Sequence, residues 1–302
     1  MNPKEMVLTM LMALPNTPTP FALLPELQYG EAPDMPPWSA SLYLDMLLPS
    51  PLPITPAPAV IYIHGGGWSE GTKCAGLSPW LNPLLAAHGF ITVSITYRLS
   101  RFASFPAQIH DVKAAVRWLR AHAEQYQVDP ERIGVWGDSA GGHLAALLAL
   151  TEGVPELEGN CGSPEYSSRV QAVIARCASY DFLHPGGELI NDAPSPVTQL
   201  FGGTVSEREE LMRLGSPITH VHPDAPPFQI VHGTLDETVP FEQAERFVPA
   251  LKSVTRSEVD FLPISEVYHN LRPEMYRYIP WSDDPWEELG WKALAFFQRH
   301  LC

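Results

Sequence analysis

The chain is poor in cysteine and in basic residues, and each shortage excludes a class of protein. Only 4 of its 302 residues are cysteine, and no two of them form a C-x-x-C pair, which argues against a zinc site and against a disulfide-built domain. Lysine and arginine number 19 against 34 aspartates and glutamates, which gives a net charge of −15. An acidic surface disfavours nucleic acid and anionic membranes as partners.

Long apolar stretches are also missing. The N-terminal run at 6–14 is too short to cross a bilayer and lacks a small-residue cleavage site. We therefore expect a cytoplasmic protein, although a chain whose leader had already been removed would read the same. The cysteines are expected to be free thiols, with a Cys161–Cys177 bridge as the alternative.

Strand and helix patterns alternate along most of the chain. Continuous apolar runs typical of buried strands lie at 59–63, 90–97, 132–136, 170–177, 228–232 and 258–264. Helical patterns lie at 79–88, 108–126, 241–251 and 285–300. This order predicts an α/β fold with a mostly parallel central sheet and helices on both faces.

The 32 prolines are frequent in two segments that interrupt this order. Residues 1–40 are expected to form an extended arm that packs onto the body, because proline is excluded from helix interiors. Residues 41–48 alternate as an edge strand would. Residues 179–227 predict a lid-like excursion over the sheet. We therefore expect one domain, 41–302, with an N-terminal arm and a small lid.

A G-x-S-x-G sequence at 137–141 stands between a strand pattern and a helix pattern. This context is typical of a nucleophile elbow, in which glycines permit a turn so sharp that the serine hydroxyl points outward. The sequence thus predicts Ser139 as a nucleophile. A second stretch, His-Gly-Gly-Gly-Trp at 64–68, directly follows the strand pattern at 59–63. Consecutive glycines let backbone N–H groups point into open space, where they can bind an oxyanion.

A serine hydroxyl needs a base, and the base needs an acid that orients it. In α/β-hydrolases the acid follows the serine in the chain and the histidine comes last. Asp236 follows the strand pattern at 228–232 and is the predicted acid, with Asp181 and Glu237 as reserve candidates. Two histidines follow Asp236, and His269 is the predicted base because His300 belongs to the terminal helix.

These motifs resemble the hormone-sensitive-lipase-like branch of the α/β-hydrolases over about residues 40 to 300. The segments at 135–145, 167–173 and 226–236 resemble the bifunctional feruloyl/acetyl-xylan esterase type most. The resemblance implies an α/β-hydrolase fold and an oxyanion hole formed by the backbone amides of Gly66, Gly67 and Ala140. It also implies that His64 braces the glycine-rich loop. The chain departs from the family at Asn270, where a glycine usually follows the histidine.

Further residues receive more local roles. Trp68, Asp138 and Asp181 are assigned to the substrate pocket, with packing beneath the loop as the alternative for Trp68. His143 is expected to be a buried helix residue that touches the sheet. Asp111 is expected to form a structural ion pair with Arg98.

Together the residues predict a serine carboxylesterase that hydrolyses short-chain acyl or aryl esters, with acetyl and feruloyl esters among the candidates. The predicted partner is a small ester substrate, and the reaction requires neither a metal nor an organic cofactor. Two alternatives stay open: an arylformamidase-type amide hydrolase, and a non-catalytic binding protein on a hydrolase fold. The sequence does not determine the oligomeric state.

Overall fold

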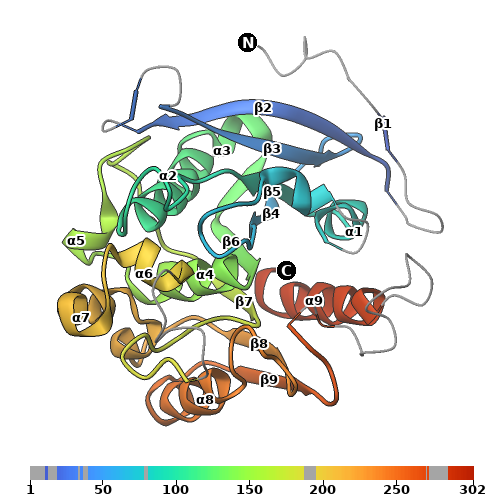
Figure 1. The fold of residues 1–302 in the computed structure, drawn as a ribbon. Coiled ribbons are helices and arrows are strands. Elements are labelled where there is room, and N and C mark those ends of the chain that lie inside the picture. Colours follow the sequence, from blue (N-terminus) through green and yellow to red (C-terminus); the bar gives the residue numbers. More distant parts are fainter. Residues whose placement is uncertain are drawn as a thin grey trace.

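A nine-stranded sheet runs through the described residues of the protein, in the order β1-β2-β3-β5-β4-β6-β7-β8-β9 (Figure 1). The structure is a computed structural model and describes residues 11–12, 19–32, 35–36, 40–77, 81–186, 195–269, 271 and 285–302. The strands are β1 (Leu11–Met12), β2 (Phe21–Glu31), β3 (Ser41–Pro49), β4 (Ala57–Ile63), β5 (Ile91–Ile95), β6 (Val128–Asp138), β7 (Ala172–Arg176), β8 (Phe228–Gly233) and β9 (Val259–Ile264). The strands from β5 to β9 in the sheet order are parallel, and β1, β2 and β3 pair antiparallel.

Helices cover both faces of this sheet, as the edge-on view in Figure 1 shows. On one face α1 (Asn82–Ala87) and α9 (Pro285–Leu301) lie against the strands. On the other face lie α2 (Ala107–Ala121), α4 (Ala140–Leu150) and α8 (Glu242–Val254). The remaining helical pieces are short: η2 (Lys73–Leu77), α3 (Ala123–Tyr126), α5 (Pro155–Glu158), α6 (Pro196–Phe201), α7 (Val205–Gly215) and η3 (Pro217–His220).

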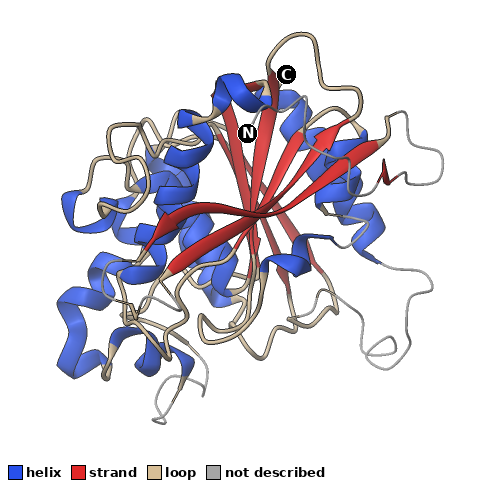
Figure 2. Ribbon diagram, turned by 90° about the horizontal axis from the view of Figure 1, so that it is seen from above, coloured by secondary structure: helices blue, strands red, loops and turns tan. Residues whose placement is uncertain are grey.

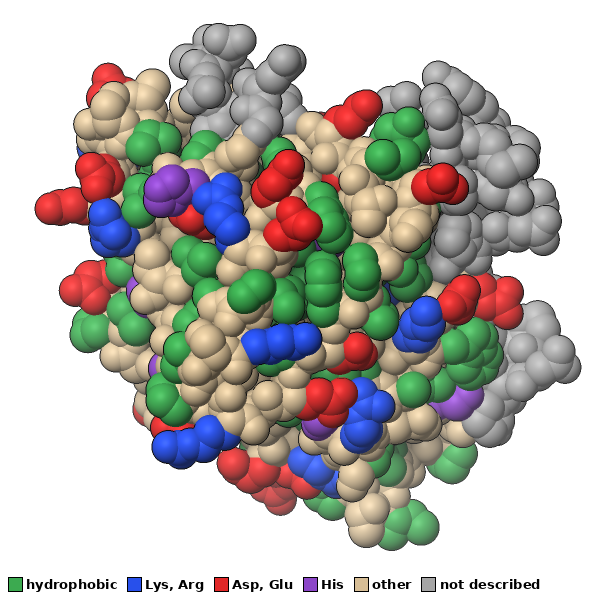
Figure 3. Space-filling model, turned by 90° about the horizontal axis from the view of Figure 1, so that it is seen from below, with side chains coloured by type: hydrophobic (Ala, Val, Ile, Leu, Met, Phe, Trp, Pro, Cys, Tyr) green, Lys and Arg blue, Asp and Glu red, His purple; other side chains and the backbone are tan. Residues whose placement is uncertain are grey.

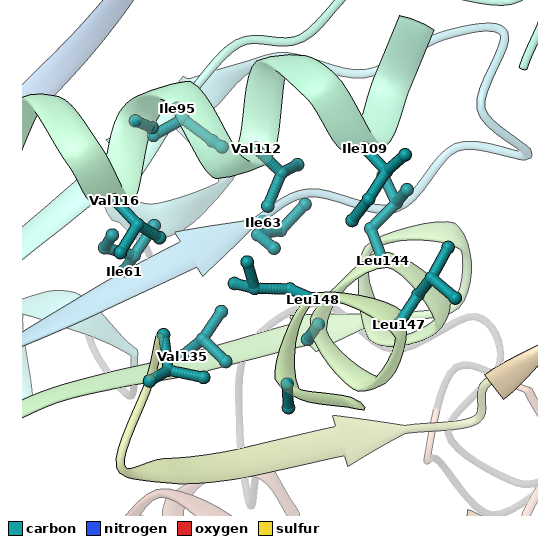
Figure 4. Packing of buried hydrophobic residues seen from close by; sticks show 14 of the residues in the cluster. Ile61, Ile63, Ile95, Ile109, Val112, Val116, Val135, Leu144, Leu147 and Leu148 are labelled. Carbon is teal, nitrogen blue, oxygen red and sulfur yellow. The ribbon is translucent and has the colours of Figure 1, made fainter. Parts of the chain in front are cut away.

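The largest core cluster fills the space between the central strands and the α2–α4 layer. Ile61, Ile63 and Val135 of the sheet meet Val112 and Leu148 of the two helices, and all five are fully buried (Figure 4). Strands covered on both faces need apolar side chains on both sides, which is why their sequences are continuous apolar runs. The predicted α/β fold with a mostly parallel sheet is confirmed.

Two expectations about the N-terminal half need correction. Residues 41–48 are not an edge strand, because β3 pairs with β5 on one side and with β2 on the other. Within the expected arm, residues 21–31 form β2, so this part of the arm is a strand of the sheet. The alternating pattern of β3 suggested one exposed face, yet Leu44, Asp45 and Met46 are all buried.

The other departures are smaller. The helix expected at 108–126 is divided at His122 into α2 and α3. The described part of the 179–227 excursion contains α6, α7 and η3, and its action as a lid stays a prediction. All four cysteines are free thiols, so the Cys161–Cys177 bridge does not form. Within the described ranges, no helix has the length and apolarity needed to span a bilayer.

Candidate active site

The nucleophile elbow is built where β6 ends and α4 begins (Figure 1). Figure 2 shows the layers around it, with the strands of the sheet between helices on both sides. Ser139 adopts φ 55° and ψ −119°, a strained conformation for a residue with a side chain. The glycines on either side permit this turn: a Cβ at Gly137 would lie 2.4 Å from the carbonyl carbon of Gly141. A Cβ at Gly141 would lie 2.0 Å from the carbonyl oxygen of Ile63. The spacing of glycines in the motif therefore follows from close backbone approach.

The three predicted residues of the triad meet above the sheet. His269 Nε2 accepts a hydrogen bond from Ser139 Oγ at 2.9 Å, and His269 Nδ1 donates to Asp236 Oδ2 at 2.7 Å. Asp236 lies on the loop after β8, and His269 lies on the loop after β9. The Asp236 side chain is fully buried, whereas that of His269 is 24% exposed. The imidazole of His269 is therefore accessible from the cavity, while the carboxylate of Asp236 is shielded from water.

The carboxylate of Asp236 is surrounded by donors. The backbone amides of Thr238 and Val239 donate to Oδ1 at 2.9 and 2.8 Å. Burial by itself would raise the pKa of Asp236, but hydrogen bonds from His232 and His269 outweigh it and lower the pKa to about 2. The group is therefore a permanent anion at neutral pH.

The glycine-rich loop after β4 lines the same cavity as Ser139 and His269. Gly66 and Gly67 have φ values of +114° and +54°, which a side chain would disfavour. Within the described residues, the amides of Gly66, Gly67 and Ala140 donate to no protein acceptor. Three unpaired donors next to a serine hydroxyl can stabilise a negatively charged oxygen.

His64 anchors this loop from below. Its Nδ1 bonds the carbonyl oxygen of Gly65 at 2.8 Å, and its ring stacks on Tyr97 with 4.3 Å between centroids. Burial lowers the pKa of His64, so the ring is neutral. These contacts agree with a bracing role for His64.

A cavity of about 380 Å³ opens over the serine. Its wall is mostly apolar and combines the glycine-rich loop, the excursion and the turn after β8. The lining residues are Gly66, Gly67, Trp68, Ser69, Glu70, Ser139, Ser179, Pro185, Pro196, Val197, Thr238, Val239, Pro240 and His269. Such a wall favours an uncharged ligand over an anionic one.

The three residues assigned to the substrate pocket differ in position. Trp68 lines the cavity and also packs beneath the loop, where its Nε1 donates to His143 Nδ1 at 3.1 Å. Asp138 and Asp181 are not among the described lining residues. Asp138 Oδ2 instead accepts from Tyr62 Oη at 2.9 Å, beneath the elbow.

The carboxylate of Asp181 is engaged in its own loop, where it accepts from the backbone amides of Leu183 and His184. Glu237 is exposed, and among the described residues His269 bonds Asp236 and not Glu237. His300 lies on α9 and contacts Glu258, so neither it nor the reserve acids reach the serine. Asn270 lies outside the described residues.

The expected ion pair and the expected burial of His143 in a helix are confirmed, whereas contact of His143 with the sheet stays a prediction. Asp111 and Arg98 form a buried ion pair with 2.7 Å between Oδ1 and Nη2. His143 is fully buried in α4 and binds the carbonyl oxygen of Gly215 through Nε2 at 2.8 Å. It therefore touches the excursion in addition to the loop of Trp68.

Sequence reasoning missed two buried neighbours of Asp236. Cys177, His232 and Asp236 bring possible metal ligands within 4.8 Å of one another. The carboxylate oxygens already accept hydrogen bonds from His269, Thr238 and Val239, so we describe the group as a hydrogen-bonded cluster. The signal that could have found His232 is its place at the end of the strand that leads to the acid.

The fold, the elbow and the converging side chains define an α/β-hydrolase. The BD-FAE family model matches residues 44–251, and the chain belongs to that family. The resemblance to hormone-sensitive-lipase-like esterases is thereby confirmed.

The relatives of the chain carry esterase names. It is 34% identical over 251 residues to the probable carboxylic ester hydrolase LipM of Mycobacterium tuberculosis. The alignment covers 81% of this chain and 55% of LipM. The chain thus spans about half the length of the curated relatives it matches.

Two solved structures are similar over nearly their whole length. A truncated form of a carbohydrate esterase from gut microbiota superposes with a TM-score of 0.77 at 29% identity, covering 92% of this chain and 95% of that one. Esterase Est2 of Thermogutta terrifontis with bound propionate gives a TM-score of 0.72 at 26% identity, covering 91% and 93%.

Proposed function

We propose that this protein is a serine carboxylesterase, with Ser139 as nucleophile, His269 as general base and Asp236 as the acid that orients it. The observation that carries the proposal is the pair of short contacts through His269, to Ser139 Oγ at 2.9 Å and to Asp236 Oδ2 at 2.7 Å. The cavity over the serine and the esterase names of the relatives support it.

The reaction follows from this geometry. Ser139 Oγ attacks the ester carbonyl carbon while its proton passes to His269 Nε2. The oxygen that becomes negative is bound by the amides of Gly66, Gly67 and Ala140. His269 then gives its proton to the departing alcohol, which leaves an acyl-enzyme. Water repeats the sequence, releases the carboxylic acid and restores the serine.

The substrate class follows from the wall of the cavity. We propose uncharged esters with a short or aryl acyl group, including acetyl and feruloyl esters of carbohydrates. A space of about 380 Å³ accepts a small acyl group more easily than a long chain. Two of the similar structures are described as a carbohydrate esterase and as an esterase with bound propionate, which fits short acyl groups.

The test compares the unmodified protein with Ser139→Ala on a panel of acyl chain lengths, together with methyl ferulate, acetylated xylan and N-formylkynurenine. We expect Ser139→Ala to lower kcat by about four to six orders of magnitude. Short-chain esters should give the highest kcat/KM. A higher kcat/KM for N-formylkynurenine than for every ester would instead support the amidase alternative.

The matched control is Ser253→Ala, which removes an exposed hydroxyl on α8. A fluorophosphonate probe should label the unmodified protein and this control, but not Ser139→Ala. An unmodified protein that stays unlabelled would point to a non-catalytic binding protein. Labelling of Ser139→Ala would show that another residue is the nucleophile.

A further inference from the structure

We propose that His232 is a positioning residue for the reaction: it holds the Asp236 carboxylate and the turn after it in the orientation that His269 requires. The inference rests on the proposed function, because it gives His232 a role only if Asp236 orients the base. His232 lies at the end of β8 and is fully buried beneath Asp236.

One nitrogen of His232 makes both of the relevant contacts. Its Nε2 lies 2.9 Å from the carbonyl oxygen of Val239 and 3.2 Å from Asp236 Oδ2. A carbonyl oxygen only accepts, so Nε2 carries a proton and is the donor in this contact. Within the described residues, the other ring nitrogen, Nδ1, has no hydrogen-bond partner. All polar contacts of the ring therefore pass through the proton on Nε2.

The proton on His232 Nε2 completes a closed set of contacts among His232, Asp236 and Val239. The amide of Val239 donates to Asp236 Oδ1 at 2.8 Å, while the carbonyl of the same residue accepts from His232. Asp236 Oδ2 faces His232 and also receives the 2.7 Å hydrogen bond from His269. His232 thus fixes both the carboxylate and the turn whose amides hold it.

The other buried side chains around Asp236 are poor substitutes for His232. The Cys177 thiol lies within 4.8 Å of the Asp236 carboxylate, and burial together with that anion raises the pKa of Cys177 well above its usual value. The ring of Phe241 packs edge-on against His232 with 5.7 Å between centroids. A thiol is a weak donor, so it is a poor substitute for the imidazole. Without His232, we expect the carboxylate to turn away from His269.

The experiment compares His232→Met with His232→Gln. Methionine fills a similar space without a donor, whereas the glutamine amide can donate from nearly the position of Nε2. Active sites are counted with the fluorophosphonate probe, so that kcat refers to folded enzyme only. We expect His232→Met to lower kcat by roughly ten- to a hundredfold with KM little changed, because misorientation of a base slows chemistry more than binding. His232→Gln should recover most of this loss.

A second readout does not depend on turnover. The proton between His269 Nδ1 and Asp236 should give a far-downfield signal in the proton NMR spectrum of the unmodified protein and of His232→Gln. In His232→Met this signal should shift or broaden. If His232→Met proves insoluble, His232→Asn takes its place, since its shorter amide cannot reach Asp236.

Each outcome bears on one claim. Equal kcat and an unchanged NMR signal in the donor-free variant would overturn the role of His232 and leave the esterase proposal intact. Equal losses in the glutamine and donor-free variants would reduce His232 to a packing residue. If the unmodified protein neither reacts with the probe nor hydrolyses esters, the proposed function itself fails.

Discussion

At the scale of single residues, the surroundings decide what each carboxylate can do. Asp236 and Asp111 are both buried aspartates, yet their pKa values move in opposite directions. Burial raises the pKa of Asp111 despite its contacts with Arg98, whereas the donors around Asp236 outweigh burial and lower its pKa to about 2. Asp236 is therefore a buried anion because the hydrogen bonds to its carboxylate outweigh the effect of burial.

The low pKa of Asp236 predicts how stability depends on pH. The pKa of this carboxyl is near its ordinary value of 3.8 in the unfolded chain and about 2 in the folded protein, so its contribution to stability is complete above about pH 4 and is lost as the pH falls through 2. We expect Asp236→Asn to lower the free energy of unfolding by about 2 kcal/mol at pH 7. Urea unfolding at several pH values should show the difference from the unmodified protein shrinking between pH 4 and pH 2. A difference that stays constant over that range would contradict the assignment.

At the scale of elements, one chain of hydrogen bonds links the glycine-rich loop, α4 and the excursion. We call this chain, through Trp68, His143 and Gly215, the relay. Trp68 of the glycine-rich loop donates to His143 of α4, which donates to the carbonyl oxygen of Gly215 at the end of α7. Burial lowers the pKa of His143 to about 4. Its neutral ring can therefore accept on one side and donate on the other, and so holds the loop and the excursion in a fixed relation.

We expect Trp68→Phe to break this relay while keeping an aromatic ring. The change leaves His143 Nδ1 buried without its donor, which should cost about 1–3 kcal/mol in unfolding free energy. Because the loop also carries the amides of Gly66 and Gly67, kcat should fall as well. The matched control is Trp291→Phe on α9, where the tryptophan is 43% exposed. Thermal unfolding and ester hydrolysis of both variants test the relay, and equal effects would argue against it.

At the scale of the whole molecule, the net charge follows from composition alone, whereas the sheet depends on pairing between distant segments. The net charge of −15 is a property of composition, yet the face drawn in Figure 3 carries acidic and basic side chains interspersed. The sheet, in contrast, depends on strands from both ends of the chain, with β2 at one side and β9 at the other.

We expect a chain that begins at residue 40 to lose stability and to aggregate. Removing β2 would leave the backbone donors and acceptors of β3 unpaired at an edge, which invites pairing between molecules. It would also uncover Leu42, Leu44 and Met46, which are buried in the intact protein. A chain beginning at residue 19 is the control. Size-exclusion chromatography and thermal unfolding measure the difference, and two chains that behave alike would contradict the prediction.

The sequence singled out three residues that the structure brings together, Ser139, Asp236 and His269, because its local motifs have narrow physical requirements. The elbow needs glycines where backbones approach closely, and Gly137 and Gly141 stand there. The sequence failed at β2 and β3, because an alternating pattern does not reveal which strand pairs outside it. The described wall of the cavity does not include Asp138 or Asp181, since chain neighbourhood says little about which side chain reaches a cavity, and their assignment to the pocket stays a prediction.

By itself, the sequence determined the alternation of elements and the identity of Ser139, Asp236 and His269, the three residues that meet at the candidate site, because strand periodicity and a sharp turn are local properties of the chain. Only the tertiary structure decided that β3 is internal, that Asp236 is a buried anion and that His232 lies beneath it. These features depend on contacts between segments far apart in the chain. Their energies arise from burial and hydrogen-bond geometry, which exist only once the sheet has formed.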